Sequence, residues 1–303
     1  MKWSAATALV ISLLVAGYAH AAPCVDLPHM SHPDAVITAC TAEIQLSRAR
    51  VDVATAYTVR SHAYALNGNK EQALADLNQA LAIAPYFWGA LVNRAVFYTN
   101  AGQLDLALKD YNDAILFHAD IPEAYLYRAV IYSKKGDLDH ALADVNEALR
   151  RNPKYIAAYL FRADRDLDMG RSDFAITDAT SALSLDAKSA QALNIRCWVR
   201  AVSGQELKSA LADCDRAVAL APREPGYLDS RGLVELRLGD WDGAIRDYTS
   251  AVRLSAMMPT SLYGRGVAER RKGDLSAAQA DTSAATAMDK RVAAQFASWG
   301  LNP

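Results

Sequence analysis

The sequence lacks the motifs that mark the common catalytic and cofactor sites. It contains no HExxH metal-binding helix, no Walker phosphate-binding loop, no CxxC pair and no GxSxG nucleophile turn. The 6 histidines form no cluster, and His29 and His32 stand in a proline-containing segment without a third metal ligand. Gly264 and Gly266 lie in a helical pattern and lack the strand that a dinucleotide site requires. We therefore expect no enzymatic activity, no cofactor and no metal site.

Charge of one sign and long apolar runs are lacking as well. Lys and Arg number 32 against 34 Asp and Glu, which argues against nucleic-acid binding because that usually needs a basic face. The apolar run from Ala5 to Gly17 is shorter than the roughly 20 residues of a membrane-spanning helix. Followed by Ala19-His20-Ala21, it predicts a cleavable signal peptide rather than a membrane anchor. We expect a periplasmic or secreted mature chain without a membrane span.

Glycine and proline are few, 15 and 10 in 303 residues, and many of the glycines recur at a nearly constant interval. A glycine and an alanine each return every 34 residues, with one interval of 35 in each column: Gly68, Gly102, Gly136, Gly170, Gly204, Gly239 and Gly273; Ala73, Ala107, Ala141, Ala175, Ala210, Ala244 and Ala278. Apolar and small residues recur at helical spacing on both sides of each glycine, which predicts two helices per unit. One such hairpin cannot bury its apolar face alone, so neighbouring units must stack into a solenoid.

The third unit, residues 122–155, resembles the tetratricopeptide repeat. It reads PEAYLYRAVIYSKKGDLDHALADVNEALRRNPKY. The residues at the characteristic places of that family are Tyr125, Ala129, Tyr132, Ala141, Val145 and Pro153. The resemblance extends over residues 54–292 and implies an all-α fold, a right-handed α-α superhelical solenoid of tandem hairpins.

The register divides the chain into a signal peptide, a cap, repeats and a second cap. Residues 1–21 are the predicted signal peptide, and residues 22–53 an N-terminal cap in which Val36–Leu46 aligns with the second helix of a unit. Seven units are expected at 54–87, 88–121, 122–155, 156–189, 190–224, 225–258 and 259–292. Residues 293–303 should form a C-terminal capping helix over the last unit.

Arginine and aspartate form two further columns at the repeat period. Each arginine precedes its aspartate by 16 residues, or by 17 in the unit with the insertion, so the same two helical positions should meet in every hairpin. The pairs are Arg60 with Asp76, Arg94 with Asp110, Arg128 with Asp144, Arg162 with Asp178, Arg196 with Asp213, Arg231 with Asp247 and Arg265 with Asp281. Identical pairs along a rod cannot converge on one substrate, so we interpret them as a structural ladder rather than as acid–base catalysts.

The sequence has only 4 cysteines, and Cys197 and Cys214 directly follow members of one Arg–Asp pair. If the two columns meet, these thiols meet as well. Cys24 and Cys40 repeat the separation of 16 residues, and Cys40 aligns with Cys214. In an exported chain this predicts the disulfides Cys24–Cys40 and Cys197–Cys214, with buried free thiols as the alternative.

The tetratricopeptide resemblance also implies a concave groove lined by the first helix of each unit. The expected lining is largely apolar and comprises Val92, Val96, Thr99, Leu126, Val130, Ser133, Leu160, Asp164, Leu167, Asn194, Trp198, Leu233, Leu236, Tyr263 and Val267. Trp198 and Tyr263 are the expected anchors for a partner, and packing of Trp198 between helices is the alternative for that residue. The Lys and Asn pair with which some relatives hold a carboxylate is missing at the matching places.

These features predict an exported scaffold or adaptor that binds a protein or peptide in its groove, within envelope assembly, secretion or cell-wall machinery. A polysaccharide or lipid carrier is the alternative, because apolar grooves with aromatic residues also suit such ligands. Few aromatic residues are expected in the groove, which weighs against sugar stacking.

Overall fold

The structure, a computed structural model, describes Cys24 and residues 32–302. In this part of the chain the elements are α-helices and no strand occurs. The helices form two compact units, each containing several of the repeats, which are called hairpins from here on. The boundary between the two units in the sequence lies between Pro153 and Lys154. This boundary separates two successive hairpins, so each unit contains whole hairpins.

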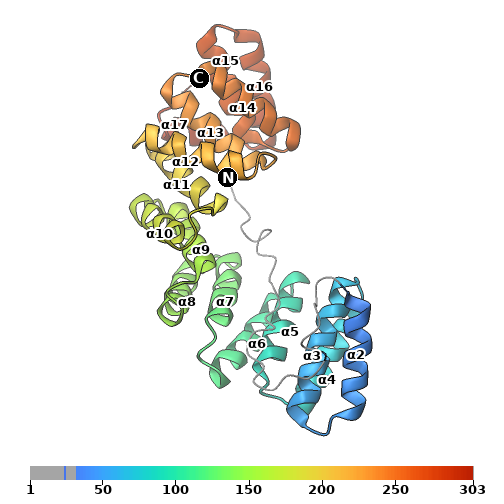
Figure 1. The fold of residues 1–303 in the computed structure, drawn as a ribbon. Helices are drawn as coiled ribbons and strands as arrows, with labels where there is room; N and C mark the ends of the chain where they lie inside the picture. Colours follow the sequence, from blue (N-terminus) through green and yellow to red (C-terminus); the bar gives the residue numbers. More distant parts are fainter. Residues whose placement is uncertain (1–23, 25–31, 303) are drawn as a thin grey trace. The chain divides into compact units, whose positions relative to one another are not determined.

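Each unit is a run of antiparallel helical hairpins (Figure 1). The N-terminal unit comprises α2 (Pro33–Leu46), α3 (Arg50–Leu66), α4 (Lys70–Ile83), α5 (Trp88–Asn100), α6 (Leu104–Phe117), α7 (Pro122–Lys134) and α8 (Leu138–Arg151). The C-terminal unit comprises α9 (Ile156–Asp168), α10 (Ser172–Leu185), α11 (Ala190–Ser203), α12 (Leu207–Leu220), α13 (Pro225–Leu238), α14 (Trp241–Leu254), α15 (Pro259–Lys272), α16 (Leu275–Met288) and the short α17 (Val292–Ser298).

The hairpin of α7 and α8 shows how local sequence signals set the helix ends. Pro122 occupies the first turn of α7, where its missing N–H costs no hydrogen bond. Gly136 follows α7 with φ of +81°, a left-handed conformation that glycine adopts without a steric penalty. Asp137 then caps α8, because its side chain accepts a hydrogen bond from the backbone N–H of His140 at 3.2 Å.

The first helices of successive hairpins pack against one another within each unit. This layer, here called the inner layer, consists of α3, α5 and α7 in the N-terminal unit and of α9, α11, α13 and α15 in the C-terminal unit. Each second helix packs against the first helix of its own hairpin and, within its unit, against the first helix of the next. The alanines that recur at the repeat period are buried at these contacts, and their small side chains let the helices approach closely.

One additional helix covers the first hairpin of the N-terminal unit, and another covers the last hairpin of the C-terminal unit. Val36 and Cys40 of α2 are fully buried, and α2 packs against α3. At the other end, α17 packs against α15 and α16 and buries Val292 and Phe296. Apolar residues of the first hairpin of the N-terminal unit and of the last hairpin of the C-terminal unit are therefore covered by another helix.

Gly264 and Gly266 are packing residues of α15. A Cβ atom at Gly264 would lie 2.5 Å from Cζ of the buried Tyr248, and one at Gly266 would lie 2.8 Å from Cγ2 of Thr282. No real Cβ approaches other atoms so closely, so each glycine makes room for a side chain of the neighbouring second helix.

We expect Gly264→Ala to lower the stability of the C-terminal unit. Overpacking against Tyr248 costs about 1–3 kcal/mol. The higher helix propensity of alanine returns less than about 1 kcal/mol of this. Thermal melting followed by circular dichroism measures the change. Tyr248→Phe removes the hydroxyl group next to the new methyl group, so the double variant should recover part of the loss. Equal losses in both backgrounds would show that this contact is not the cause.

Candidate binding surface

Every predicted Arg–Asp pair is present as a bidentate ion pair between the two helices of one hairpin. Nε and Nη2 of each arginine donate to the two carboxylate oxygens at 2.5–2.9 Å. The aspartate side chains are 2–14 % exposed and the arginine side chains 14–26 %. The hydrogen bond that each guanidinium donates to its aspartate raises the pKa of the guanidinium, so the arginines stay charged.

Arginines of the ladder also bind the helix that precedes their own hairpin, through a polar column that the sequence analysis missed. Nη1 donates to a side-chain oxygen of the previous second helix at 2.7–3.2 Å: Thr41 for Arg60, Asn78 for Arg94, Asn112 for Arg128, Thr180 for Arg196, Asp215 for Arg231 and Thr249 for Arg265. From Asn78 onward these acceptors lie two residues after an aspartate of the ladder. Their recurrence at the repeat period was the signal that could have found them.

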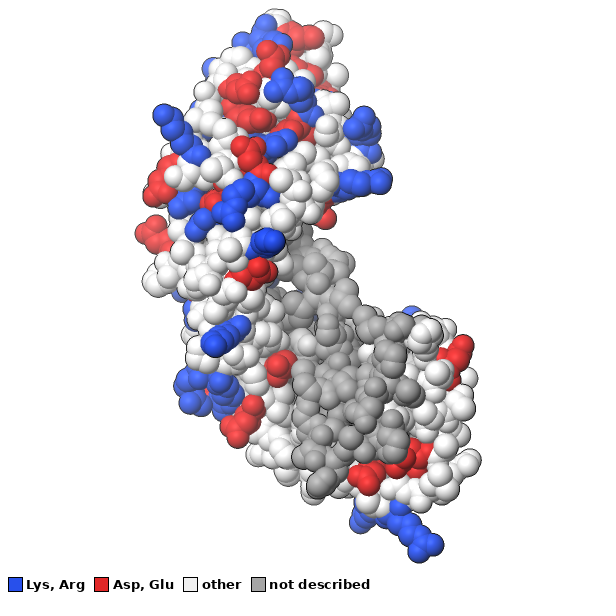
Figure 2. Space-filling model, viewed as in Figure 1, with Lys and Arg blue, Asp and Glu red and all other residues white. Residues whose placement is uncertain are grey.

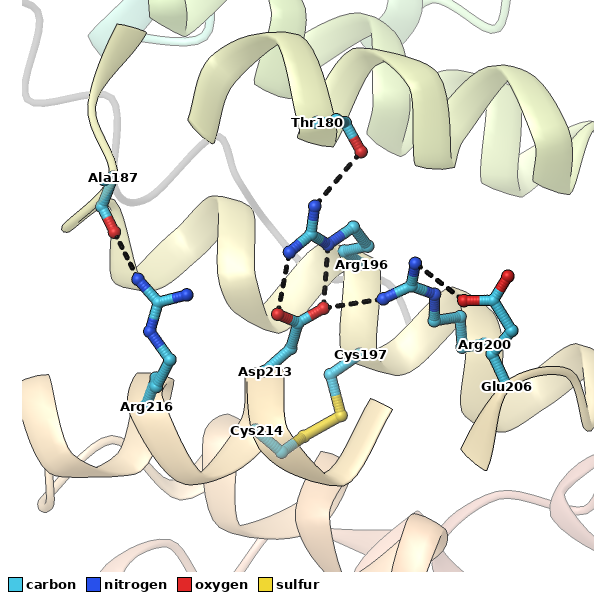
Figure 3. A network of polar contacts seen from close by, with 9 residues as sticks. All are labelled: Thr180, Ala187, Arg196, Cys197, Arg200, Glu206, Asp213, Cys214 and Arg216. Atoms are coloured by element: carbon cyan, nitrogen blue, oxygen red, sulfur yellow. Dashed lines mark hydrogen bonds and ion pairs between the residues drawn. A yellow bond between two sulfur atoms is a disulfide. The ribbon is translucent and has the colours of Figure 1, made fainter. Parts of the chain in front are cut away.

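The cysteines form the two predicted disulfides. The Cα atoms of Cys24 and Cys40 are 5.1 Å apart, and those of Cys197 and Cys214 are 5.5 Å apart. Figure 3 shows the second disulfide directly beside the ion pair of Arg196 and Asp213. All four cysteines are buried, so both bonds belong to the core.

Figure 3 also shows that this hairpin carries a second cation. Nη1 of Arg200 donates to Asp213 at 2.9 Å, and its Nη2 lies 2.9 Å from Glu206. The chain of charges therefore runs from α10 through Arg196, Asp213 and Arg200 to the turn before α12. Because it consists of ion pairs between packed helices, this network fixes the geometry of the hairpin.

Most of the residues expected to line an open groove are buried, whereas Ser133, Asp164 and Leu167 are partly buried. The buried residues include Val92, Val96, Leu126, Val130, Leu160, Asn194, Trp198, Tyr263 and Val267, the most exposed of which are Val130 and Leu160 at 8 %. They do lie on first helices, as the register implies. The expectation of an apolar surface open at these positions is therefore corrected, because their side chains are packed.

In the C-terminal unit, the segment after Arg291 covers part of the inner layer. The Trp198 and Trp299 rings meet edge to face with centroids 5.5 Å apart, and the Tyr263 and Phe296 rings lie 4.9 Å apart. Trp198 therefore packs against the chain's own C-terminal segment, which neither alternative of the sequence analysis included.

A cavity of about 390 Å³ lies where α13, α15 and α17 begin. Its wall includes Gly226, Met258, Thr260 and Val292. Next to Thr260, the carboxylate of Asp229 accepts a hydrogen bond from Ser261 Oγ at 2.5 Å and a longer one from Thr260. Asp229 is 1 % exposed, and burial raises the pKa of its carboxyl group to about 6.

Within the described residues, no group of three or more His, Cys, Asp or Glu side chains could hold a metal ion. The same residues include no helix that is both long enough and apolar enough to span a membrane. On the face shown in Figure 2, acidic and basic side chains are interspersed over the C-terminal unit.

Comparison with known proteins identifies the repeat. Models of the tetratricopeptide repeat match residues 54–87, 122–155 and 230–291. Comparison with curated protein sequences gives no match. Among solved structures, a tetratricopeptide repeat protein from Parabacteroides merdae is 20 % identical with a TM-score of 0.61, over 82 % of this chain and 98 % of its own.

Two further solved structures have a similar fold. The hetero-tetramer Cut9–Hcn1 of the APC/C matches with a TM-score of 0.67 at 15 % identity, over 91 % of this chain and 54 % of its own. YrrB, described as a TPR protein with an unusual peptide-binding site, matches with a TM-score of 0.51 at 16 % identity, over 62 % of this chain and 97 % of its own. At these identities the likeness shows the fold.

Asp110→Ala should destabilise the N-terminal unit by about 3 kcal/mol, because it leaves the largely buried guanidinium of Arg94 without its carboxylate. Urea unfolding followed by circular dichroism measures this loss. The control is Lys109→Ala on the same helix, which removes an exposed ion pair with Asp113 and should change stability by no more than about 1 kcal/mol. If the two variants unfold alike, the ladder does not hold the hairpin together.

Asp229→Asn should change how stability depends on pH. The pKa of Asp229 is about 6 in the folded chain against 3.8 for an ordinary aspartate, so the folded state binds the proton more tightly. The stability that protonation of Asp229 contributes is therefore fully present below about pH 4 and is lost as the pH rises to about 6. Asn carries no charge and should make the chain more stable than the parent above pH 6, by up to about 3 kcal/mol.

Melting temperatures between pH 4 and pH 8 test this difference. The control Asp120→Asn changes an exposed carboxylate and should leave the pH dependence unchanged. Parallel pH profiles for the parent and Asp229→Asn would contradict the assignment of this slope to Asp229.

Proposed function

Because the chain is a tetratricopeptide repeat protein, we propose that it is an exported scaffold or adaptor that binds a protein or peptide on its inner layer. The observation that carries the proposal is the way in which the ladder joins each hairpin to the next within a unit. Arg94, for example, binds two helices besides its own, which fixes the spacing between successive first helices. Side chains at equivalent positions then recur at regular intervals and can contact successive residues of a partner.

The similar structures support binding as the use of this fold. YrrB is described as having a peptide-binding site, and Cut9 is found in a complex with Hcn1. The proposal extends that use to this chain. The polysaccharide or lipid carrier gains less support, because Trp198 and Tyr263 pack against rings of the same chain and offer no open stacking face.

Export is supported by the two disulfides, since structural disulfides persist in oxidising compartments such as the periplasm. The predicted signal peptide, residues 1–21, lies outside the described residues. We place the adaptor in envelope assembly, secretion or cell-wall machinery, where an exported protein without enzymatic activity would act by holding others together.

The binding surface that we propose is the exposed edge of the inner layer, at the C-terminal ends of its helices. Leu66 of α3 is 45 % exposed, and Asn100 of α5 is exposed at the same repeat position. Val202, Arg237 and Arg271 occupy this position in the C-terminal unit, and Arg237 and Arg271 bind the C-terminal segment there. At this repeat position, Arg237 and Arg271 of the C-terminal unit contact the chain's own C-terminal segment, whereas Leu66 and Asn100 of the N-terminal unit are exposed.

Crosslinking in the intact native envelope tests the proposal, with the crosslinked proteins recovered by antibody and quantified by mass spectrometry. Introducing Leu66→Glu and Asn100→Glu together should reduce the captured partner about tenfold, because both side chains lie at the proposed contact. The control is Leu116→Glu on the second helix α6, where the side chain is 74 % exposed. If Leu116→Glu abolishes capture and the inner-layer variant does not, the partner binds the outer helices instead.

A further inference from the structure

The last described residues lie on the inner layer of the C-terminal unit like a bound peptide. Phe296 is fully buried against Tyr263, whereas Trp299 is only partly buried and reaches Trp198 on α11. Leu301 packs against the same apolar cluster. The segment thus has a deep anchor within α17 and a shallower part, residues 299–302, beyond the end of that helix.

Arginines hold the shallow part by its backbone. Nη2 of Arg237 donates to the carbonyl oxygen of Trp299 at 2.6 Å and to that of Val202 at 2.9 Å. Nη2 of Arg271 donates to the carbonyl oxygen of Asn302 at 3.3 Å. Backbone carbonyls are present in any peptide, so these donors do not depend on the sequence of the segment.

Arg237 differs from the arginines of the ladder. Among the described residues it forms no ion pair with a carboxylate, and its Nε has no hydrogen-bond partner. Burial lowers the pKa of its guanidinium, which means that the charge is held in a poorly solvated place. A half-buried cation that binds only carbonyl oxygens is costly for a purely structural contact, because a buried charge is unfavourable unless it is paired.

We propose that the surface formed by Trp198, Val202 and Arg237 is a binding site for a peptide segment with an aromatic side chain, and that residues 299–302 occupy it in the free protein. This proposal rests on the proposed function, because it names the partner chemistry for part of the same inner layer. The partner's aromatic ring takes the place of Trp299 against Trp198, and its backbone carbonyl takes the hydrogen bond from Arg237. Phe296 stays buried, so α17 remains a cap while the site is open.

Residues 299–302 can leave the site while α17 stays in place, because this part of the segment is short. Gly300 has φ of +73°, so the chain turns sharply after Trp299, and residues 300 and 302 are exposed. Contacts with the inner layer come from the Trp299 ring, Leu301 and two carbonyl groups, whereas the backbone N–H groups of Gly300 and Leu301 donate to carbonyls of α17 itself. A partner that offers the same groups competes with the tethered segment, and its apparent affinity falls in proportion to the fraction of molecules in which the site is open.

The test uses the full chain and a fluorescent peptide of residues 296–303, FASWGLNP, as the probe. The parent should bind the peptide weakly, and Trp299→Ala should bind it at least about tenfold more tightly because the site is vacated. A peptide with alanine in place of its tryptophan should lose this binding. Adding Arg237→Met to Trp299→Ala should weaken peptide binding at least about fivefold through the lost carbonyl hydrogen bond.

Matched controls separate this site from general effects. Leu275→Ala changes a side chain that is 60 % exposed on α16 and should leave peptide affinity at the parent value. If melting shows that Trp299→Ala does not fold, Leu301→Ser serves as the vacating variant, because it weakens the same segment and keeps both aromatic rings.

Equal peptide affinity for the parent and the vacated variants, including no binding by either, would overturn the proposal. So would unchanged binding of the peptide that lacks tryptophan, or binding of a cello-oligosaccharide in place of the peptide. These results leave the proposed function standing if the Leu66→Glu and Asn100→Glu variant still loses its crosslinked partner. If the peptide test fails in this way and the Leu66→Glu and Asn100→Glu variant also keeps its crosslinked partner, the inner layer is not a binding surface.

Discussion

The fold depends on one repeated interaction, the buried ion pair between arginine and aspartate. Burying a charge is costly unless its partner and hydrogen bonds are supplied in good geometry. Here the planar guanidinium meets both carboxylate oxygens and uses a third nitrogen for the preceding hairpin, as Arg94 does with Asp110 and Asn78. The same bonds that compensate for desolvation therefore also determine how one hairpin sits on the next. An apolar contact of equal area would stabilise the stack without specifying this register.

The two units support their arginines in different ways. In the N-terminal unit a tyrosine four residues after the arginine places its ring beside the guanidinium, as Tyr98 does for Arg94 with 5.9 Å between them. In the C-terminal unit charged residues take that position, namely Asp166, Arg200, Glu235 and Glu269. Burial and nearby carboxylates raise the pKa of Glu235 to about 8, so this carboxyl group is largely protonated at neutral pH. Glu235 therefore adds a pH-dependent charge beside the Arg231–Asp247 pair of the C-terminal unit.

The location of bulky and small residues decides what the inner layer can bind. Alanine and glycine let the helices approach, and the large side chains of the first helices fill the space that remains, so the layer is a packed surface rather than an empty channel. Binding then relies on the exposed edge of the layer and on contacts that can be exchanged. In the C-terminal unit the chain itself supplies such contacts, through Trp299 and the carbonyl groups around it.

The sequence alone determined the repeat, the hairpins, the Arg–Asp pairs and both disulfides. All of these follow from periodicity, because residues at a fixed separation across one hairpin must meet in every copy, and Cys197 and Cys214 could be paired by the neighbours that they follow. Only the tertiary structure decided which first-helix side chains are buried and what lies on them. The contact of Trp198 with Trp299 joins a first helix to the segment after α17, and it depends on how several helices pack and on how the chain turns there. Periodicity carries no information on that turn, because the C-terminal segment occurs once and has no equivalent in the repeat.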